Sequence, residues 1–414
     1  MSILLKNARI YDTRSEYHLK RADILIEDGI IKKIKSRIKS STKTQVVESE
    51  NLSVSPGWLD VGAYNGEPGH EALEDLNSLK MAAAAGGYLY LATLPTTSPT
   101  IDNKSQISYL QKNNDKAVTE ILPLACATQG AQGAVISEII DLDQSGAVAY
   151  TDGPDHQINR AQLMRVLQYL RRIDGIYIHY LKHDCLVSHG QINEGTQSMK
   201  LGLVGMPKTE ERLEALNAVE IARYVGTDVH IHNISTPEVI QKTSDIKVSY
   251  SVPFLNLIHT DQDLEGFDTN LKVIPPLREP SDRKGLIKLI NQGKINCINS
   301  NHRPVLREDK DKEFGMAKFG NIGLQHCYRA LHTHATKLEH ERLIYCLSQG
   351  AYEYLKLEAP KLQAGQQARL TVFDPDASST IEQSYSKCGN NPVAADQLSG
   401  SIIGVINGVK NTFN

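Results

Sequence analysis

Short apolar segments alternate with amphipathic helical segments along most of this 414-residue chain. Strand-like stretches such as "YLYLATLP" (88–95), "GIYIHYL" (175–181) and "IKVSYSVP" (246–253) are separated by helical stretches such as "NRAQLMRVLQYLRRID" (159–174). That alternation requires a parallel sheet covered by helices. No GxGxxG or GxxxxGK[ST] loop follows a strand, which argues against a nucleotide-binding sheet. We therefore predict an α/β fold of the (β/α)8 barrel type.

Both ends of the chain differ from this pattern because they contain strands without intervening helices. The strand-like segments are "SILLKNARIYD" (2–12), "ADILIEDGIIKKI" (22–34), "ARLTVFDPD" (368–376) and "SGSIIGVINGVKN" (399–411). Strand-rich segments at the two ends of a barrel can pair with each other. We predict that 1–54 and 361–414 form one composite small β-sandwich domain and that 55–360 form the barrel.

The composition narrows the class of protein. The 45 Lys and Arg residues nearly balance the 48 Asp and Glu residues, and no basic stripe argues for nucleic acid. No uninterrupted apolar run reaches the roughly 18 residues of a membrane span, and the first residues do not resemble a signal peptide. The six cysteines include no CxxC pair. We predict reduced thiols in a cytoplasmic protein.

In barrels of this kind, working residues lie where strands end and the following loops begin. The predicted strand ends are 60–64, 95–97, Asp152, His179, 230–233, 251–254 and 299–302. Their His and Asp residues are of the types that bind the metal in metal-dependent hydrolases, but they are few.

A series of short motifs, in order along the whole chain, resembles the dihydroorotase family of the amidohydrolase superfamily. The motifs are "PGWLDV" (56–61), "EPG" (67–69), "EDL" (74–76), "LPTTSPTID" (94–102), "GAVAYTDG" (146–153), "NEGTQSMKLGLVGMP" (193–207), "VHIHNIST" (229–236), "PPLREPSDR" (275–283), "FGNIGLQ" (319–325), "FDPD" (373–376) and "SKCGNNPV" (386–393). Hydantoinases and allantoinases share the barrel, but the EPG, NEG and PPLR stretches fit dihydroorotase better.

The resemblance implies a metal-dependent barrel with a small β domain. It also implies reversible ring closure between carbamoyl-aspartate and dihydroorotate. One or two zinc ions would activate a water and polarise the amide. An Asp would move the proton, and Arg and Asn side chains would hold the substrate carboxylate.

Several positions depart from the family pattern. Gly62 and Tyr64 stand where the family has the two histidines of its first metal-binding strand. Gly66 stands at the family's substrate arginine, and Thr96 stands at its asparagine after Pro95. Glycine has no ligand atom, and a phenol would normally have to ionise before binding zinc.

At later positions along the chain, some of the family's metal-binding residue types are retained and others are replaced. Asp152 matches the family's bridging carboxylate, and the next ligand histidine matches His179, with His183 as an alternative. A carboxylate hydrogen-bonded at a strand end and a barrel histidine satisfied by its neighbours are the structural alternatives for Asp152 and His179. Asn233 replaces a ligand histidine.

Two further changes remove substrate-handling groups. Ile274 replaces a substrate asparagine, and Asn301 replaces the catalytic aspartate. A carboxamide cannot accept and return a proton as a carboxylate does. We therefore expect no catalytic residue and no bound metal.

The remaining histidines leave a relocated metal site open. His230 and His232 share one face of a strand. Because the matched ligand position, 233, lies on the other face, we expect both to point toward the helical layer unless the strand ends in a bulge. A reduced site would use Asp152, His179 and His232. His302, beside the lost base, is interpreted as a residual hydrogen-bonding group, and the sequence around 332–334 is interpreted as helix surface.

Three functions follow. The first is a non-catalytic dihydroorotase-like protein of pyrimidine biosynthesis, a homodimer that assembles with aspartate carbamoyltransferase, as some members of this family do. The second is an active cyclic amidohydrolase with a reduced or relocated zinc site. The third is a metabolite-binding module whose pocket is lined by Tyr64, Thr96 and Arg303.

If the first function holds, we expect Tyr64 to fill the former metal position. The charged segment 303–320 is either a solvated loop or a lid over the barrel mouth.

Overall fold

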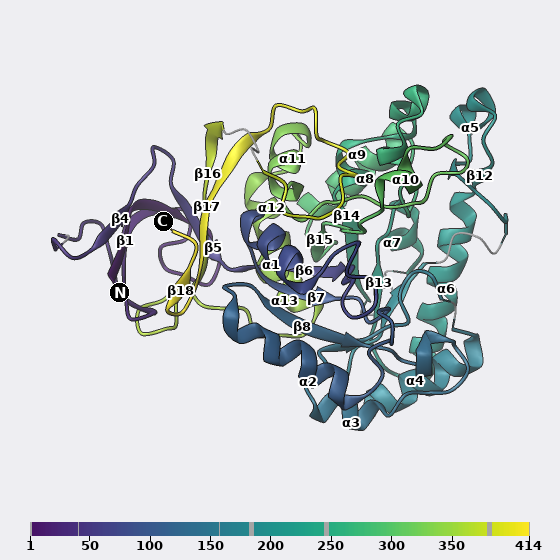
Figure 1. Cartoon of the computed structure of the whole chain (residues 1–414), viewed down its shortest axis with the longest axis horizontal. Coiled ribbons are helices and arrows are strands. Elements are labelled where there is room, and N and C mark those ends of the chain that lie inside the picture. Colours follow the sequence, from purple (N-terminus) through teal and green to yellow (C-terminus); the bar gives the residue numbers. More distant parts are fainter. Residues whose placement is uncertain are drawn as a thin grey trace.

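A computed structural model describes residues 2–39, 41–156, 158–181, 186–243, 248–378 and 383–413. It contains a helix-covered barrel and a smaller strand-rich domain (Figure 1). Within the described residues, no helix combines the length and the apolar character that crossing a membrane requires. The predicted fold class is confirmed.

The barrel consists of parallel strands that all lie within the described residues. In chain order they are β6 (Trp58–Ala63), β7 (Tyr88–Thr93), β8 (Glu120–Ala125), β9 (Ala149–Tyr150), β10 (Ile178–Tyr180), β13 (Val229–His232), β14 (Val248–Pro253) and β15 (Cys297–Asn299). A bridge between Tyr150 and Tyr177 joins the two four-stranded halves. On the other side, the Ser300 N–H and hydroxyl donate to Asp60 at 2.7 and 2.8 Å, so this carboxyl group links the first strand to the last.

Helices cover the outside of the barrel. They include α1 (Leu76–Ala85), α2 (Lys104–Lys112), α3 (Ile139–Gln144), α4 (Arg160–Arg172), α6 (Lys208–Val225), α7 (Glu238–Thr243), α9 (Pro280–Asn291), α11 (Cys327–His334), α12 (His340–Leu347) and α13 (Gln349–Tyr354). In α4 the buried residues Leu163, Val166 and Leu170 recur at helical spacing, and the Asn159 side chain caps the first turn. Helix α6 ends at Gly226, whose left-handed conformation suits glycine.

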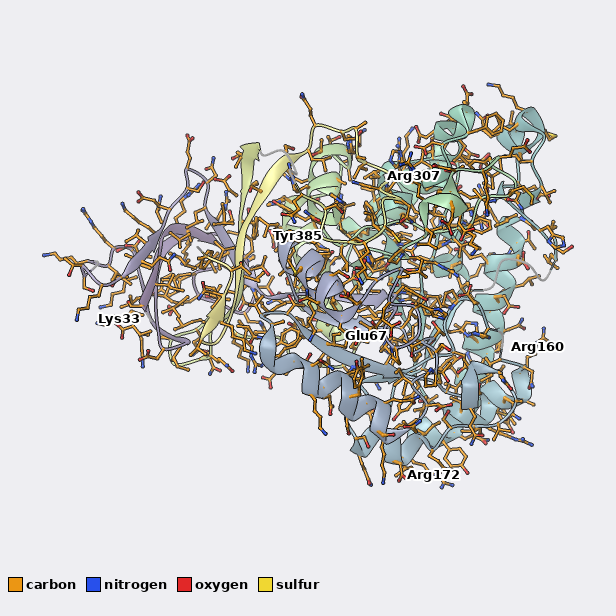
Figure 2. All side chains as sticks on the ribbon, in the orientation of Figure 1. Lys33, Glu67, Arg160, Arg172, Arg307 and Tyr385 are labelled. Carbon is orange, nitrogen blue, oxygen red and sulfur yellow. The ribbon has the colours of Figure 1, made fainter. Side chains whose placement is uncertain are left out.

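Strands from both ends of the chain form one small sheet. Its order is β18 (Lys410–Asn411), β17 (Ser399–Asn407), β16 (Arg369–Ser378), β5 (Ser53–Pro56), β1 (Ser2–Ile10), β2 (Arg21–Glu27) and β3 (Ile30–Lys35), with β4 (Gln45–Val47) beside β1. The pairing of β5 with both β1 and β16 brings the two chain ends together. Charged side chains such as Lys33 on this sheet and Arg172 and Arg307 on the barrel project from the periphery (Figure 2).

Part of the C-terminal segment returns to the barrel. Lys387 lies 2.5 Å from Asp75, and the Cys388 thiol donates to the Leu73 carbonyl at 3.3 Å. Asn390 donates its amide to the Arg303 carbonyl at 3.1 Å. Residues 387–390 therefore connect the loop after β6 to the loop after β15, both at the mouth of the barrel.

Candidate functional site at the barrel mouth

The end of β6 cannot carry a side chain toward the barrel centre. Gly62 has a φ of +87°, which side-chain-bearing residues rarely adopt. A Cβ atom at this position would lie 2.4 Å from the Tyr180 hydroxyl oxygen and 2.7 Å from His232 Nε2. Side chains from β10 and β13 therefore fill the space into which a residue at position 62 would project.

Tyr64 does not fill this space, contrary to the expectation from the sequence. Its backbone N–H donates to the His302 carbonyl at 2.8 Å, which ties the loop after β6 to the loop after β15. Its side chain instead lines a separate cleft of about 470 Å³ above the mouth, together with Arg303 and Lys272. Burial raises the pKa of the Tyr64 phenol, so it stays protonated at neutral pH.

Gly66, which the family resemblance matches to a substrate arginine, lies in a tight turn. A Cβ atom there would lie 2.2 Å from the Glu74 carbonyl oxygen and 2.6 Å from the His70 carbonyl oxygen. No arginine fits at this position without rebuilding the turn.

His232 points into the barrel, so the expected orientation toward the helical layer is wrong. Its side chain lines the mouth cavity, and its ring lies 4.6 Å from the ring of Tyr180 on the neighbouring strand. The next residue, Asn233, has a φ of +60°. This left-handed turn ends the strand alternation and brings residues 232 and 233 to the same cavity.

The Nδ1 atom of His232 is engaged. It lies 2.8 Å from the Ser251 hydroxyl and 3.1 Å from the Tyr354 hydroxyl. Burial lowers the pKa of His232 to about 3, so the ring is neutral at physiological pH. Nδ1 is therefore not available to a metal without breaking these hydrogen bonds.

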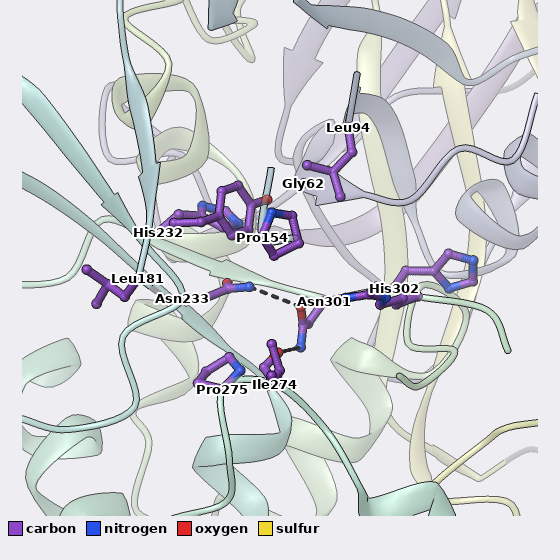
Figure 3. A pocket seen from close by; sticks show the side chains of 12 residues that line it. Gly62, Leu94, Pro154, Leu181, His232, Asn233, Ile274, Pro275, Asn301 and His302 are labelled. Atoms are coloured by element: carbon purple, nitrogen blue, oxygen red, sulfur yellow. Dashed lines mark hydrogen bonds between the residues drawn. The ribbon is translucent and has the colours of Figure 1, made fainter. Parts of the chain in front are cut away.

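Three asparagine side chains form a continuous amide chain at the mouth. Figure 3 shows its bonds from Asn233 to Asn301 and from Asn301 to Ile274. The Asn299 amide donates to Asn233 at 2.7 Å, and the Asn233 amide donates to Asn301 at 3.0 Å. Asn301 then donates to the Ile274 carbonyl at 2.9 Å. We call Asn233, Asn299, Asn301, Ser251 and His232 the mouth network; it is neutral, and its members bond one another.

The carboxylate of Asp152 is hydrogen-bonded to the loop after β8. Its two carboxylate oxygens accept from the Thr128 N–H at 2.9 Å and the Thr128 hydroxyl at 2.7 Å. Burial raises the pKa of Asp152, although the hydrogen bonds from Thr128 oppose this shift. Thr96 packs nearby, with its methyl group 2.9 Å from where a Cβ of Gly153 would lie. These residues shape the loops after β7, β8 and β9.

His179 faces the helical layer, and Tyr180 takes the inward position on β10. The His179 ring lines a surface groove between α4 and α6, beside Leu163 and Ala218. Burial lowers its pKa to about 4. The alternative candidate, His183, lies outside the described residues.

The described residues therefore do not fit a catalytic metal. Asp152 is bonded to Thr128, His179 faces the helices, and His232 is bonded through Nδ1 to two hydroxyl groups. Within the described part of the chain, no group of three or more His, Cys, Asp or Glu side chains is arranged to hold a metal ion.

The mouth cavity itself is small. Its volume is about 30 Å³. Figure 3 shows the residues that line it, which include Gly62, Tyr180, His232, Asn233, Ile274, Asn301 and Arg303. This volume is room for about one water molecule, whereas small-molecule pockets usually measure roughly 300–1,000 Å³. At the rim, Arg303 pairs with Asp155 at 2.8 Å.

His302 belongs to a second group at the edge of the mouth. Its Nδ1 accepts from the Gly323 N–H at 3.2 Å, so Nε2 carries the proton and donates to Glu74 at 3.3 Å. Burial would raise the pKa of Glu74, but hydrogen bonds from His302, Ser386 and Ser78 outweigh it and hold the pKa below its usual value. The hydrogen-bonding interpretation of His302 agrees with these contacts.

The other histidine pair lies away from the mouth. His332 on α11 stacks on Tyr328 with ring centroids 5.8 Å apart, and His334 pairs with Asp396 at 2.8 Å.

Several of the family-like motifs meet in a buried polar cluster behind the mouth. Arg278 of "PPLR" donates to Ser235 of "IST" at 2.8 Å and to Asn193 of "NEG" at 3.0 Å. It also pairs with Glu211 of α6 at 3.2 Å, and Glu211 accepts from the Ser235 and Thr236 N–H groups. We call Asn193, Glu211, Ser235 and Arg278 the framework cluster, since it joins loops and a helix and does not reach the mouth cavity.

Reasoning from the sequence missed Tyr180, and it gave no role to Ser251 at a predicted strand end or to Glu74 in the "EDL" motif. The inward direction of Tyr180 becomes clear only from the pairing of β10 with β13. Glu74 is brought to His302 by a contact between residues 228 positions apart, which the motif does not reveal.

Comparison with known proteins agrees with the fold and with the motifs. Residues 52–239 match a family model described as Dihydro-orotase-like. A dihydroorotase of Carboxydothermus hydrogenoformans is 32% identical over 97% of this chain and 95% of the relative. A dihydroorotase of Trichlorobacter lovleyi is 31% identical over the full length of both chains.

Solved structures with the same fold include the L-hydantoinase (dihydropyrimidinase) of Arthrobacter aurescens. It superposes with a TM-score of 0.81 over 100% of this chain and 96% of that structure, at 18% identity. A D-hydantoinase structure gives a TM-score of 0.81 at 16% identity, with 95% of that structure covered. The sequence relatives, which cover nearly the whole chain, show that it belongs to the dihydroorotase family of the amidohydrolase superfamily.

Proposed function

We propose that this chain is a non-catalytic member of the dihydroorotase family with a structural or regulatory role in pyrimidine biosynthesis. The observation that carries the proposal is the mouth cavity of about 30 Å³, which is filled by side chains of the barrel itself. A ring-shaped substrate needs roughly ten times that volume.

The chemistry of the lining supports the same proposal. The Asn301 carbonyl oxygen accepts from Asn233, and its amide donates to Ile274, so this side chain is fixed in place and cannot act as a general base. Because the described residues do not fit a metal, we propose that the protein works without a bound cofactor.

The family resemblance supports a partner. We propose that the chain is a cytoplasmic homodimer that assembles with aspartate carbamoyltransferase. The barrel and small sheet would then act as a scaffold, while the reaction is carried out by another protein.

An active cyclic amidohydrolase is the second candidate function. The names of the relatives favour it, because each of those reported above is a dihydroorotase. Such an enzyme would need zinc on a reduced set of ligands, and Asp152, His179 and His232 would have to leave their present surroundings to form it.

A metabolite-binding module is the third candidate. The cleft of about 470 Å³ beside Tyr64 and Arg303 has the size of a small-molecule site. Thr96 is absent from its lining, so the predicted trio is not brought together there.

One preparation tests these functions. The purified full chain is analysed for bound metal and assayed for dihydroorotate hydrolysis with and without added zinc, with the Carboxydothermus hydrogenoformans dihydroorotase as positive control. We expect less than stoichiometric metal and no turnover. Stoichiometric zinc together with turnover would reject the non-catalytic proposal in favour of the second candidate.

The partner and the ligand need separate measurements. Affinity purification from the native host should recover aspartate carbamoyltransferase if the assembly proposal is right. Calorimetric titration with dihydroorotate and with carbamoyl-aspartate tests the third candidate, for which we expect saturable binding without turnover that is weakened by Arg303→Gln.

A further inference from the structure

Tyr180 occupies the space into which the side chain of a metal ligand at position 62 would project. Its hydroxyl oxygen lies 2.4 Å from the position of a Cβ on residue 62, closer than any real Cβ contact allows. That oxygen is buried and has no hydrogen-bond partner among the described residues. The tyrosine therefore fills space at this point without gaining a hydrogen bond.

The packing around Tyr180 fixes its position. Its ring packs against that of His232, with centroids 4.6 Å apart and ring planes tilted by 52°, and His232 is itself held by Ser251 and Tyr354. The Tyr180 and His232 positions are paired in the parallel register of β10 and β13, so their side chains lie side by side on the inner face. Moving Tyr180 out of the mouth would break this ring contact.

We propose that Tyr180, packed on His232, is a plug that prevents metal binding at the mouth independently of the missing ligands. This inference rests on the proposed absence of a metal, and it adds that restoring ligand side chains alone will not restore a metal site. The plug must be shortened first.

A stability cycle tests the contact directly. Gly62→Ala is made in the wild-type chain and in a Tyr180→Phe background, and thermal unfolding of all four proteins is measured. We expect Gly62→Ala to lower the melting temperature by several degrees and Tyr180→Phe to reduce that loss, because the hydroxyl is the nearest atom to the added methyl group. Equal losses in the two backgrounds would overturn the plug.

The loss in the Tyr180→Phe background will not be zero. The backbone strain at position 62 and the His232 contact at 2.7 Å both remain. Gly130→Ala is the matched control: it also has a positive φ, of +63°, but a Cβ there meets no atom closer than 3.4 Å. Its loss measures the strain without the clash.

Cobalt binding tests the consequence. A ligand-restored chain carrying Gly62→His, Tyr64→His, Asn233→His and Asn301→Asp is compared with the same chain plus Tyr180→Ala, and each is titrated with Co²⁺ while its visible absorption is recorded. We expect absorption from bound cobalt only when Tyr180→Ala is present.

Stoichiometric cobalt in the ligand-restored chain with Tyr180 intact would overturn the proposal. So would its absence from both chains, because Tyr180 would then not be the barrier. If either chain fails to fold, the stability cycle tests the proposal instead, because it uses only single and double replacements. Stoichiometric zinc in the wild-type protein would instead reject the proposed function, so the two failures are distinguishable.

Discussion

The framework cluster and the mouth network lie on neighbouring loops of one barrel but differ in charge. In the framework cluster, a buried guanidinium and a buried carboxylate are matched and surrounded by further polar groups. In the mouth network, the side chains are neutral and are bonded to one another. The framework cluster therefore contains a matched pair of opposite charges, and the mouth network contains none.

The difference in charge shows that motifs by which the chain resembles its family can serve the structure of the barrel. The "NEG", "IST" and "PPLR" motifs owe their role here to structure, since their side chains meet around Arg278. A motif that marks a family is therefore not by itself a sign of catalysis.

Breaking the framework cluster should have the largest effect. Arg278→Leu leaves the buried Glu211 carboxylate without its cation, and we expect a loss of about 3–5 kcal/mol in the free energy of unfolding. Denaturant unfolding followed by circular dichroism measures it. Arg212→Leu, which removes a partly exposed partner of Glu238, is the control and should cost less than about 1 kcal/mol. Similar losses for the two variants would contradict the special role of the cluster.

Asp60 adds a third kind of group to the comparison, because it is a fully buried carboxyl group that joins β6 to the residue after β15. Burial raises its pKa to about 7, even though hydrogen bonds from Ser300 oppose the shift. The folded state then holds a proton that the unfolded state loses above about pH 4. The stability due to this group is complete below that pH and is lost as the pH rises to about 7, by up to about 4 kcal/mol.

Asp60→Asn should remove that part of the pH dependence. Unfolding free energies of both proteins between pH 4 and pH 8 give the comparison, and the variant should gain relative to the wild type as the pH rises. Parallel curves would show that Asp60 does not titrate in this range.

The mouth network should be less sensitive than the framework cluster. Asn233→Asp keeps the shape but turns the hydrogen bond to the Asn301 oxygen into a contact between two acceptors. We expect a loss of about 1–3 kcal/mol in unfolding free energy. Asn77→Asp, on the exposed first turn of α1, is the matched control and should be close to neutral. No loss in Asn233→Asp would mean that the amide chain does not stabilise the mouth.

The Asp155–Arg303 pair at the rim should have the smallest effect. Both side chains are partly exposed, at 51% and 32%. A double-mutant cycle with Asp155→Asn and Arg303→Gln should give a coupling below about 1 kcal/mol that falls further at 1 M salt. A coupling as large as that in the framework cluster would show that this pair closes the mouth.

Strand–helix alternation was enough to predict the barrel, because the period of apolar residues is set by local geometry. The departures from the expected family pattern at positions 62, 233 and 301 were also visible in the sequence, because the chemical type of a residue needs no coordinates to be noticed. The direction of His232 was not predictable in the same way. It depends on Asn233 adopting a left-handed conformation, which interrupts the alternation of side chains along the strand.

The sequence by itself determined the fold class and the family, since these depend on periodicity and on ordered motifs. Only the tertiary structure decided which side chains fill the space next to Gly62. Tyr180 and His232 reach Gly62 from strands more than 100 residues further along the chain. The strand register determines whether such side chains point inward. Differences of a few tenths of an ångström in contact distance determine whether their atoms exclude a ligand.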